Sequence, residues 1–357
     1  MKKLFLCAAL YLCCVCANAQ FTLDLGVVGR VDSNPTFYFK KGVKPEHNFG
    51  NSVVYTTLES SFGEHLSLTW IAHWAETGAD ATIFKNTPEL YKNTWRADCN
   101  SWTDFAYIDL TFGGFTLRGG KDCIAVGGFE YDPFDWECTY DMTSLHWQNT
   151  PAYQWGGSAI FTTASENTTF QLQAVSSSAC ERPWQNGMGQ YFFKYTGSYG
   201  PIETSNSYGL MQTTPFGQKF DAVEMLNLGL RGTIAETVAI GAEWMNRRDF
   251  SAPLASARDF FGKSFKVLGT VDITPSEMFE LHLMGGYERI GLASAIDAEW
   301  LEDADGYWTA GASVFYFPIK GSQDLRLHLT LAGNSIVDRG LSATIGILYN
   351  HTFHVVK

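Results

Sequence analysis

The sequence predicts an all-β fold, a single transmembrane antiparallel β-barrel of about 16 strands with short periplasmic turns and long extracellular loops. Three observations predict it. Segments of alternating apolar and polar residues recur along the chain, as in 325–331, where leucine occupies every second position. Such alternation gives a strand one apolar and one polar face. Connections between these segments are alternately short and long, and no apolar run in 20–357 is long enough for a transmembrane helix.

Residues 1–19 have the pattern of an export signal. Lys2 and Lys3 precede the apolar run 4–16, and Ala17-Asn18-Ala19 forms an A-x-A cleavage site. An uncleaved anchor is the alternative, but the run is shorter than the ~20 residues that span a bilayer as a helix. We therefore expect a cleaved signal peptide at 1–19, and one barrel domain over 20–357 because no linker divides this part.

The order of the strands and connections favours a membrane barrel over a soluble sheet, because turns and loops alternate strictly. Sixteen strands lie in the size range that leaves a water-filled lumen, and we expect the eight longer segments at the cell surface. The expected strands are 21–31, 51–62, 65–76, 101–112, 115–124, 153–163, 168–177, 189–199, 203–213, 223–233, 237–248, 263–273, 278–289, 306–316, 323–333 and 340–353. The longer segments between them are 32–50, 77–100, 125–152, 178–188, 214–222, 249–262, 290–305 and 334–339.

Charge and cysteine content restrict the partners. Of the 25 basic residues, Lys2 and Lys3 leave with the signal, so 23 remain against 37 acidic residues, a net charge of −14. Nucleic acid is therefore not an expected partner. An oxidising compartment favours a disulfide among the remaining cysteines, free thiols being the alternative. These cysteines are Cys99, Cys123, Cys138 and Cys180. They form no C-x-x-C zinc pattern, and we expect neither a metal nor a cofactor.

Basic residues on the strands are expected to face the lumen, because Arg or Lys facing lipid at mid-bilayer costs ~2–4 kcal/mol. Arg118, for example, points opposite to Phe115 and Leu117. The predicted pore wall comprises Arg30, Arg118, Lys194, Arg231, Arg247, Lys266 and Arg326. Acids are expected there as well, namely Asp24, Asp109, Glu243, Asp272, Glu280 and Glu288. The wall is thus predicted to be mixed in sign.

Segment 125–152 is the candidate constriction. It carries acidic residues at Glu130, Asp132, Asp135, Glu137 and Asp141, with no Lys or Arg. Four aromatic residues alternate with these acids, and exposing them all to water is unfavourable. We therefore expect this segment to turn into the barrel, where its acids face the basic wall across a narrow waist. The alternative is an outward loop that binds a divalent cation through Asp132, Asp135 and Glu137.

The layout is similar to that of general porins. The strand Phe115-Thr116-Leu117-Arg118-Gly119-Gly120-Lys121, leading into the acidic and aromatic segment, resembles the phosphate-selective porin O and P group and its relatives. The resemblance implies a third loop folded into the channel and a homotrimer. Members that select phosphate line the pore with many Arg and Lys residues, whereas this chain has an acidic loop. It also departs from the usual aromatic C-terminus, because four residues follow Phe353.

These observations predict a porin of a Gram-negative outer membrane, in contact with membrane lipid and passing small hydrophilic solutes or ions by passive diffusion. The acidic segment predicts weak cation preference or near-neutral selectivity. An enzyme is not expected, since the sequence has no G-x-S-x-G, H-E-x-x-H, P-loop or G-x-G-x-x-G pattern. The alternative function is a surface adhesin or ligand-binding barrel that uses its extracellular loops.

Overall fold

The computed structural model describes residues 21–38, 42–48, 52–77, 103–130, 139, 142–148, 150, 152–178, 180, 182–250, 264–289, 306–335 and 340–356. Its strands are β1 (Phe21–Phe37), β2 (Glu46–Asn48), β3 (Ser52–Phe62), β4 (Leu66–Thr77), β5 (Thr103–Phe112), β6 (Phe115–Cys123), β7 (Tyr153–Thr162), β8 (Thr168–Ser176), β9 (Gly189–Tyr199), β10 (Ile202–Gln212), β11 (Ala222–Ala235), β12 (Val238–Asp249), β13 (Ser264–Ser276), β14 (Phe279–Arg289), β15 (Tyr307–Tyr316), β16 (Leu325–Asn334) and β17 (Leu341–Val356). The short helices are α5 (Leu145–Gln148) and the 3-10 turn η2 (Gln185–Gly187).

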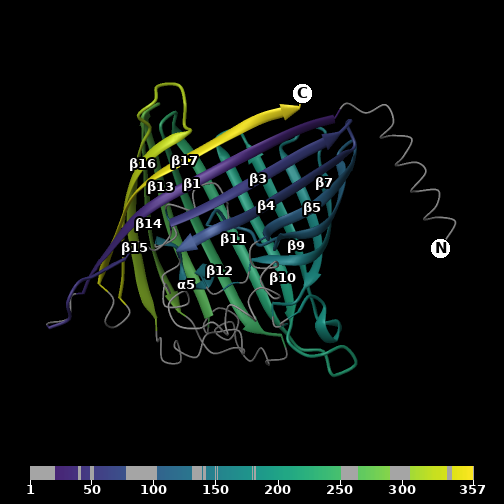
Figure 1. The fold of residues 1–357 in the computed structure, drawn as a ribbon. Coiled ribbons are helices and arrows are strands. Elements are labelled where there is room, and N and C mark those ends of the chain that lie inside the picture. Colours follow the sequence, from purple (N-terminus) through teal and green to yellow (C-terminus); the bar gives the residue numbers. More distant parts are fainter. Residues whose placement is uncertain are drawn as a thin grey trace, which may run out of the picture.

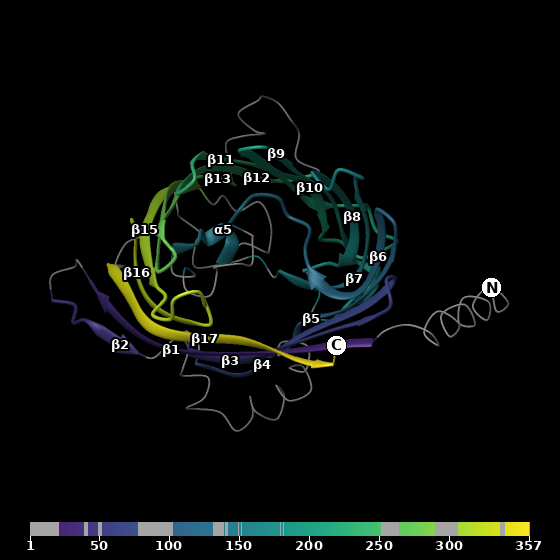
Figure 2. The same ribbon diagram turned by 90° about the horizontal axis from the view of Figure 1, so that it is seen from above.

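The strands form a closed antiparallel barrel. Apart from the three-residue β2, each strand pairs with the next along the chain, and β17 returns to pair with β1. In this closing pair Leu25 lies opposite Phe353, and Arg30 lies opposite Leu348. Figure 2 shows the resulting ring seen from above. Closure leaves no unpaired strand edge, which is what a sheet needs to lie in lipid.

The sixteen predicted strands are confirmed. Two differences stand out at the first long segment, 32–50. Strand β1 continues to Phe37, beyond the predicted end at residue 31, and β2 pairs with it within that segment. The stretch 32–37 is polar and contains Pro35, so it lacks a strand pattern of its own. Its backbone is held extended by β17, where Thr36 pairs with Ser342.

The two faces of the barrel differ as the alternation predicts. On β16, Leu327, Leu329 and Leu331 are 39, 40 and 37% exposed, whereas His328 and Thr330 between them are 3 and 1% exposed. The leucines therefore lie on the outer face, and the polar residues point inward. No helix in the described part of the chain is long and apolar enough to cross a membrane.

Short turns lie at the end of the barrel where β1 starts and β17 finishes (Figure 1). The turn between β5 and β6 is made by Gly113 and Gly114, and Gly113 has a φ of 57°, which glycine adopts without strain. Gly63 and Gly200 serve the β3–β4 and β9–β10 turns with φ values of 65° and 64°. The other ends of these strands, such as Thr77 of β4 and Arg289 of β14, lie at the opposite end of the barrel.

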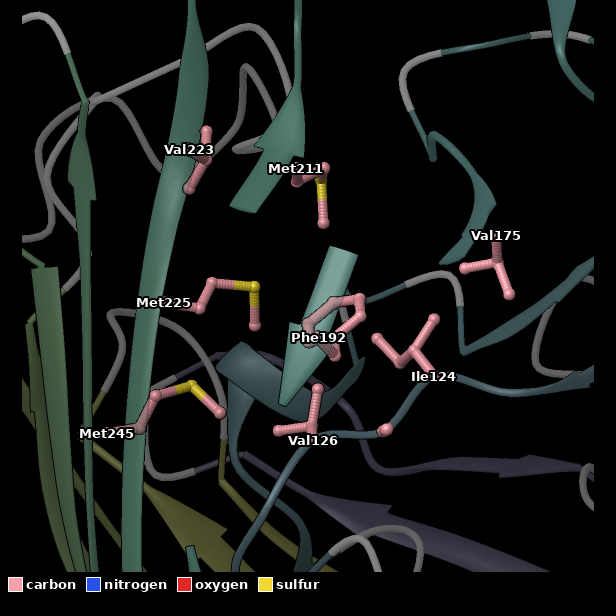
Figure 3. Close-up of a cluster of buried hydrophobic side chains, with 9 residues drawn as sticks. Ile124, Val126, Val175, Phe192, Met211, Val223, Met225 and Met245 are labelled. Atoms are coloured by element: carbon pink, nitrogen blue, oxygen red, sulfur yellow. The ribbon is translucent and has the colours of Figure 1, made fainter. Parts of the chain in front are cut away.

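The described residues of the connection between β6 and β7 include α5, which Figure 2 shows inside the ring. Ile124 and Val126 of this connection pack with inward side chains of the wall, including Phe192 on β9, Met225 on β11 and Met245 on β12 (Figure 3). All five are at most 3% exposed. A small apolar core therefore holds the start of this segment against one side of the barrel.

Candidate functional site

The backbone of 124–130 follows the inner wall closely. The Ala125 N–H donates to Gln173 Oε1 at 2.7 Å, and the Gly127 N–H donates to Ser207 Oγ at 2.6 Å. A Cβ at position 127 would lie 2.7 Å from the backbone of Asn206, so only glycine permits this approach. These bonds satisfy backbone groups that would otherwise be buried without partners.

A buried ion cluster fixes the next part of the segment. Lys266 on β13 contacts the carboxylate of Glu130 and lies 2.7 Å from Glu243 Oε1 on β12. Glu243 Oε2 also accepts the backbone N–H groups of Phe129 and Glu130, at 2.8 and 3.1 Å. The three charged side chains are at most 5% exposed. Each charge is therefore withdrawn from water, and breaking one pair would leave another uncompensated.

His146 anchors the second half of the segment. Its Nδ1 lies 2.9 Å from Glu288 Oε2, and its Nε2 lies 3.2 Å from Ser264 Oγ. The His146 backbone N–H donates to the same Glu288 oxygen, and Arg247 Nη2 donates to the His146 carbonyl at 2.9 Å. Burial lowers the pKa of His146 to about 4. The ring is therefore neutral at pH 7, with Nδ1–H as the donor to Glu288.

The carboxylate of Glu130 is easier to protonate than that of a solvent-exposed glutamate. Burial raises its pKa, and the nearby Glu243 and Glu288 act in the same direction, while Lys266 opposes them. A carboxylate surrounded by other acids and removed from water is costly to keep ionised. The lysine is consequently the residue that keeps this part of the segment ionised and fixed to the wall.

Space remains on the other side of the segment. A cavity of about 290 Å³ lies between Trp147, which is part of α5, and the wall around Tyr107 and Arg118. A second cavity, of about 330 Å³, lies towards the short turns and is lined by residues that include Phe129 and Arg231. Lys194 lines both cavities. Both cavities lie against the wall formed by β5–β11 and are lined on the other side by residues of the in-folded segment.

The two arginines that line these cavities are each paired with carboxylates. Arg118 donates from Nε and Nη2 to the two oxygens of Asp109, both at 2.8 Å, and from Nη1 to Asp122 at 3.0 Å. Its guanidinium lies 3.7 Å above the ring of Tyr107. Arg231 lies 2.6 Å from Glu203 and above the Phe129 ring. Such pairs keep cations in fixed positions while leaving little net charge.

Solved structures share this architecture, although the sequence matches no protein-family model and no curated protein. The outer membrane channel DcaP of Acinetobacter baumannii matches with a TM-score of 0.57, covering 94% of this chain and 98% of that chain at 11% identity. OmpT of Vibrio cholerae in a trimer form matches with a TM-score of 0.56, covering 93% of this chain and 100% of that chain at 11% identity. The anion-selective porin from Comamonas acidovorans matches at 0.55, over 93% and 100%, also at 11% identity. The chain has the fold of outer-membrane porins.

Within this porin fold, the seven predicted wall cations lie on the inner face but in different settings. Arg118, Lys194 and Arg231 line the cavities, whereas Lys266 and Arg247 hold the segment. The remaining two lie elsewhere on the wall. Arg30 lies 3.1 Å from Asp32, and Arg326 lies above Phe315 and Phe317. The cations therefore do not form one continuous ladder.

The predicted acidic constriction is described only at Glu130, which faces Lys266 in the wall and not open water. Asp132, Asp135, Glu137 and Asp141 lie outside the described residues. Cys123 and Cys180 are free thiols, and Cys99 and Cys138 also lie outside the described residues. In the described part, no group of three or more His, Cys, Asp or Glu side chains is arranged to hold a metal ion.

The sequence interpretation did not identify His146 as an anchor. The sequence does carry a signal for the buried charges that hold this segment, because Lys266 and Glu288 lie opposite one another in the β13–β14 register. Opposite charges on facing positions of neighbouring strands stabilise a pair. That signal becomes readable only once the register is known, and the contact of His146 with Glu288 spans 142 positions in the sequence.

Proposed function

We propose that this protein is a porin of the Gram-negative outer membrane, in which the segment between β6 and β7 narrows a water-filled channel for small hydrophilic solutes or ions. One observation carries the proposal: the segment is fixed to one inner wall by buried ions, and polar cavities lie beside it along β5–β11. The exposed leucines of β16 and similar residues around the barrel suit a lipid environment. The porin fold supports the same assignment.

The anchoring of the segment supports a constriction. Lys266 is fully buried, and the three carboxylates that hold the segment, those of Glu130, Glu243 and Glu288, are at most 5% exposed. Fixed walls on both sides of a route are what size selection requires. The proposal includes a homotrimer, for which the trimer form of the Vibrio cholerae protein gives support by likeness of fold.

Single-channel recording of the refolded protein in planar bilayers tests the proposal. Stepwise currents that grow with salt concentration are expected. Lys194 lines both cavities, so Lys194→Glu should shift the zero-current potential in a salt gradient towards cations. Lys320→Glu, in the exposed connection between β15 and β16, is the matched control and should produce a much smaller shift. A folded barrel without conductance would refute the channel and favour the adhesin alternative.

A further inference from the structure

The cavity between Trp147 and the wall has the features of a built binding site. Its volume of about 290 Å³ lies near the lower end of the range for small-molecule pockets. Four aromatic residues from three separate parts of the chain line it: Phe105 and Tyr107 on β5, Tyr153 at the start of β7, and Trp147 on α5. Segments distant in sequence thus bring aromatic surface to one small space.

The wall aromatics hold one another in place. Phe105 packs edge-to-face against Tyr107, with ring centroids 6.0 Å apart, and against Tyr153 at 5.1 Å. The guanidinium of Arg118 covers one face of the Tyr107 ring. Trp147 packs on the apolar cluster around Val126. Rings fixed before a ligand arrives lose little conformational entropy on binding.

The charged groups at and next to the cavity balance. Arg118, Lys194 and Asp122 line it, and Asp109, which does not line it, is bonded to Arg118 together with Asp122. An ion entering the cavity would meet no net opposite charge, and to bind Arg118 directly an anion would have to displace a carboxylate. A neutral solute can instead accept and donate hydrogen bonds at the edges of these pairs and at Gln171.

We propose that this cavity is a binding subsite for a neutral, ring-shaped, polyhydroxylated solute, a mono- or disaccharide. This inference rests on the proposed channel function and names its substrate class. A sugar ring has an apolar C–H face that packs on aromatic rings and a rim of hydroxyls that bond to carboxylate and amide groups. The second cavity also has hydroxyl-bearing side chains in its lining, such as Thr196, Thr204 and Ser205.

Sugar titrations of the channel current test the subsite. The purified protein is recorded in planar bilayers at fixed salt while maltose or glucose is added. Glycerol serves as a polyol without a ring face, and benzoate serves as an anion with a planar ring. We expect maltose to reduce the current saturably, glycerol to reduce it only in proportion to solution viscosity, and benzoate to show no saturable block.

Two lining variants and one control make the test specific. Trp147→Ala should raise the half-blocking concentration of maltose about tenfold. Gln171→Leu should raise it several-fold, and it keeps the proposal testable if Trp147→Ala does not fold, because Gln171 is not part of the apolar cluster. Trp308→Ala, at an outward position that is 53% exposed, should leave it unchanged.

The outcomes separate the subsite from the channel. Conductance in salt, with maltose acting only through viscosity, would overturn the subsite and leave the channel intact. Saturable block by benzoate but not by maltose would replace the proposal with an anion site. Equal effects of Trp147→Ala and Trp308→Ala would also overturn it. A folded barrel that passes no current in salt alone would refute the channel itself.

Discussion

Asp32 on β1 and His328 on β16 meet across the intervening strand β17, with 2.9 Å between Asp32 Oδ1 and His328 Nε2. Gly346 of β17 lies opposite both residues in register. Both side chains are fully buried. The pair therefore links three neighbouring strands at the place where the barrel closes, and it does so only because β17 carries no side chain at that position.

Gly346→Ala is expected to disrupt this link. A Cβ at position 346 would lie 1.9 Å from Asp32 Oδ1 and 2.5 Å from His328 Nε2. We expect a loss of ~1–3 kcal/mol in the free energy of unfolding, the usual cost of overpacking. The midpoint temperature for loss of the folded band on unboiled gels measures it. Gly29→Ala on β1 is the control, because nothing lies within 4 Å of its Cβ position; an equal shift in both variants would contradict the prediction.

Lys266→Met is expected to release the in-folded segment. The side chain is 0% exposed and bonded to Glu130 and Glu243, so its removal leaves two buried carboxylates unpaired. Removing one partner of a buried pair costs roughly 3–5 kcal/mol. We expect protease to cleave the segment faster in refolded barrels and single-channel currents to become noisier. Lys320→Met, which is exposed, should match the wild type in both measurements; unchanged cleavage in Lys266→Met would show that the segment has other sufficient anchors.

Acid should weaken the protein through His146. Its pKa falls from 6.5 to about 4 on folding, so between these values the unfolded chain binds a proton that the folded chain does not. The free energy of unfolding therefore falls as pH decreases, by about 2 kcal/mol between pH 7 and pH 5. Urea unfolding in detergent at the two pH values measures this loss.

His146→Asn is the matched variant for the acid effect, because the amide can donate to Glu288 as Nδ1 does and does not titrate. We expect it to lack most of the pH-dependent loss. The raised pKa of Glu130 stabilises the folded protein as pH decreases, which opposes the effect of His146. Because Glu130 is present in both proteins, its contribution largely cancels when their pH-dependent losses are compared. An identical loss in wild type and variant would assign the acid sensitivity to other groups.

Neutralising three of the four remaining acids of the segment should alter selectivity. Glu130 faces Lys266, so the predicted cation preference depends on Asp132, Asp135, Glu137 and Asp141. The triple variant Asp132→Asn, Asp135→Asn, Glu137→Gln should move the zero-current potential towards anions, and the shift should shrink at high salt because charges are screened. Glu130→Gln alone should change it less. An unchanged potential in the triple variant would place the selective charges on the wall, around Arg118 and Lys194.

The barrel itself could be predicted because its physical cause is local. Alternation along one strand, as at Leu327 and Leu329, follows from having lipid on one side and polar groups on the other. The short turns were likewise readable from pairs such as Gly113 and Gly114. The extension of β1 to Phe37 was missed, because Pro35 and its polar neighbours carry no such pattern and depend on β17 for their pairing.

The interior was only partly predictable. Inward orientation of Lys266 and Arg118 follows from the cost of facing lipid, but their partners do not. Lys266 contacts Glu130 across 136 positions of sequence, and Arg118 is matched by Asp109 only through the β5–β6 register. The burial of the Glu130 side chain could not be predicted from the net charge or the amino-acid composition of the segment. Which acids meet water and which meet lysine depends on how one connection lies on the wall.

The closing pair of strands has a consequence for how the barrel assembles. Every other main strand pairs with its neighbour along the chain, but β1 and β17 bring Leu23 opposite Val356. Hairpins can form early because little chain must be ordered to join them, whereas the last seam joins the two most distant strands and carries the largest loop entropy. Insertion should therefore pass through an open, curved sheet with both outer strands unpaired. Until the seam forms, those two edges are the place where a chaperone or an assembly factor can bind by adding a strand of its own.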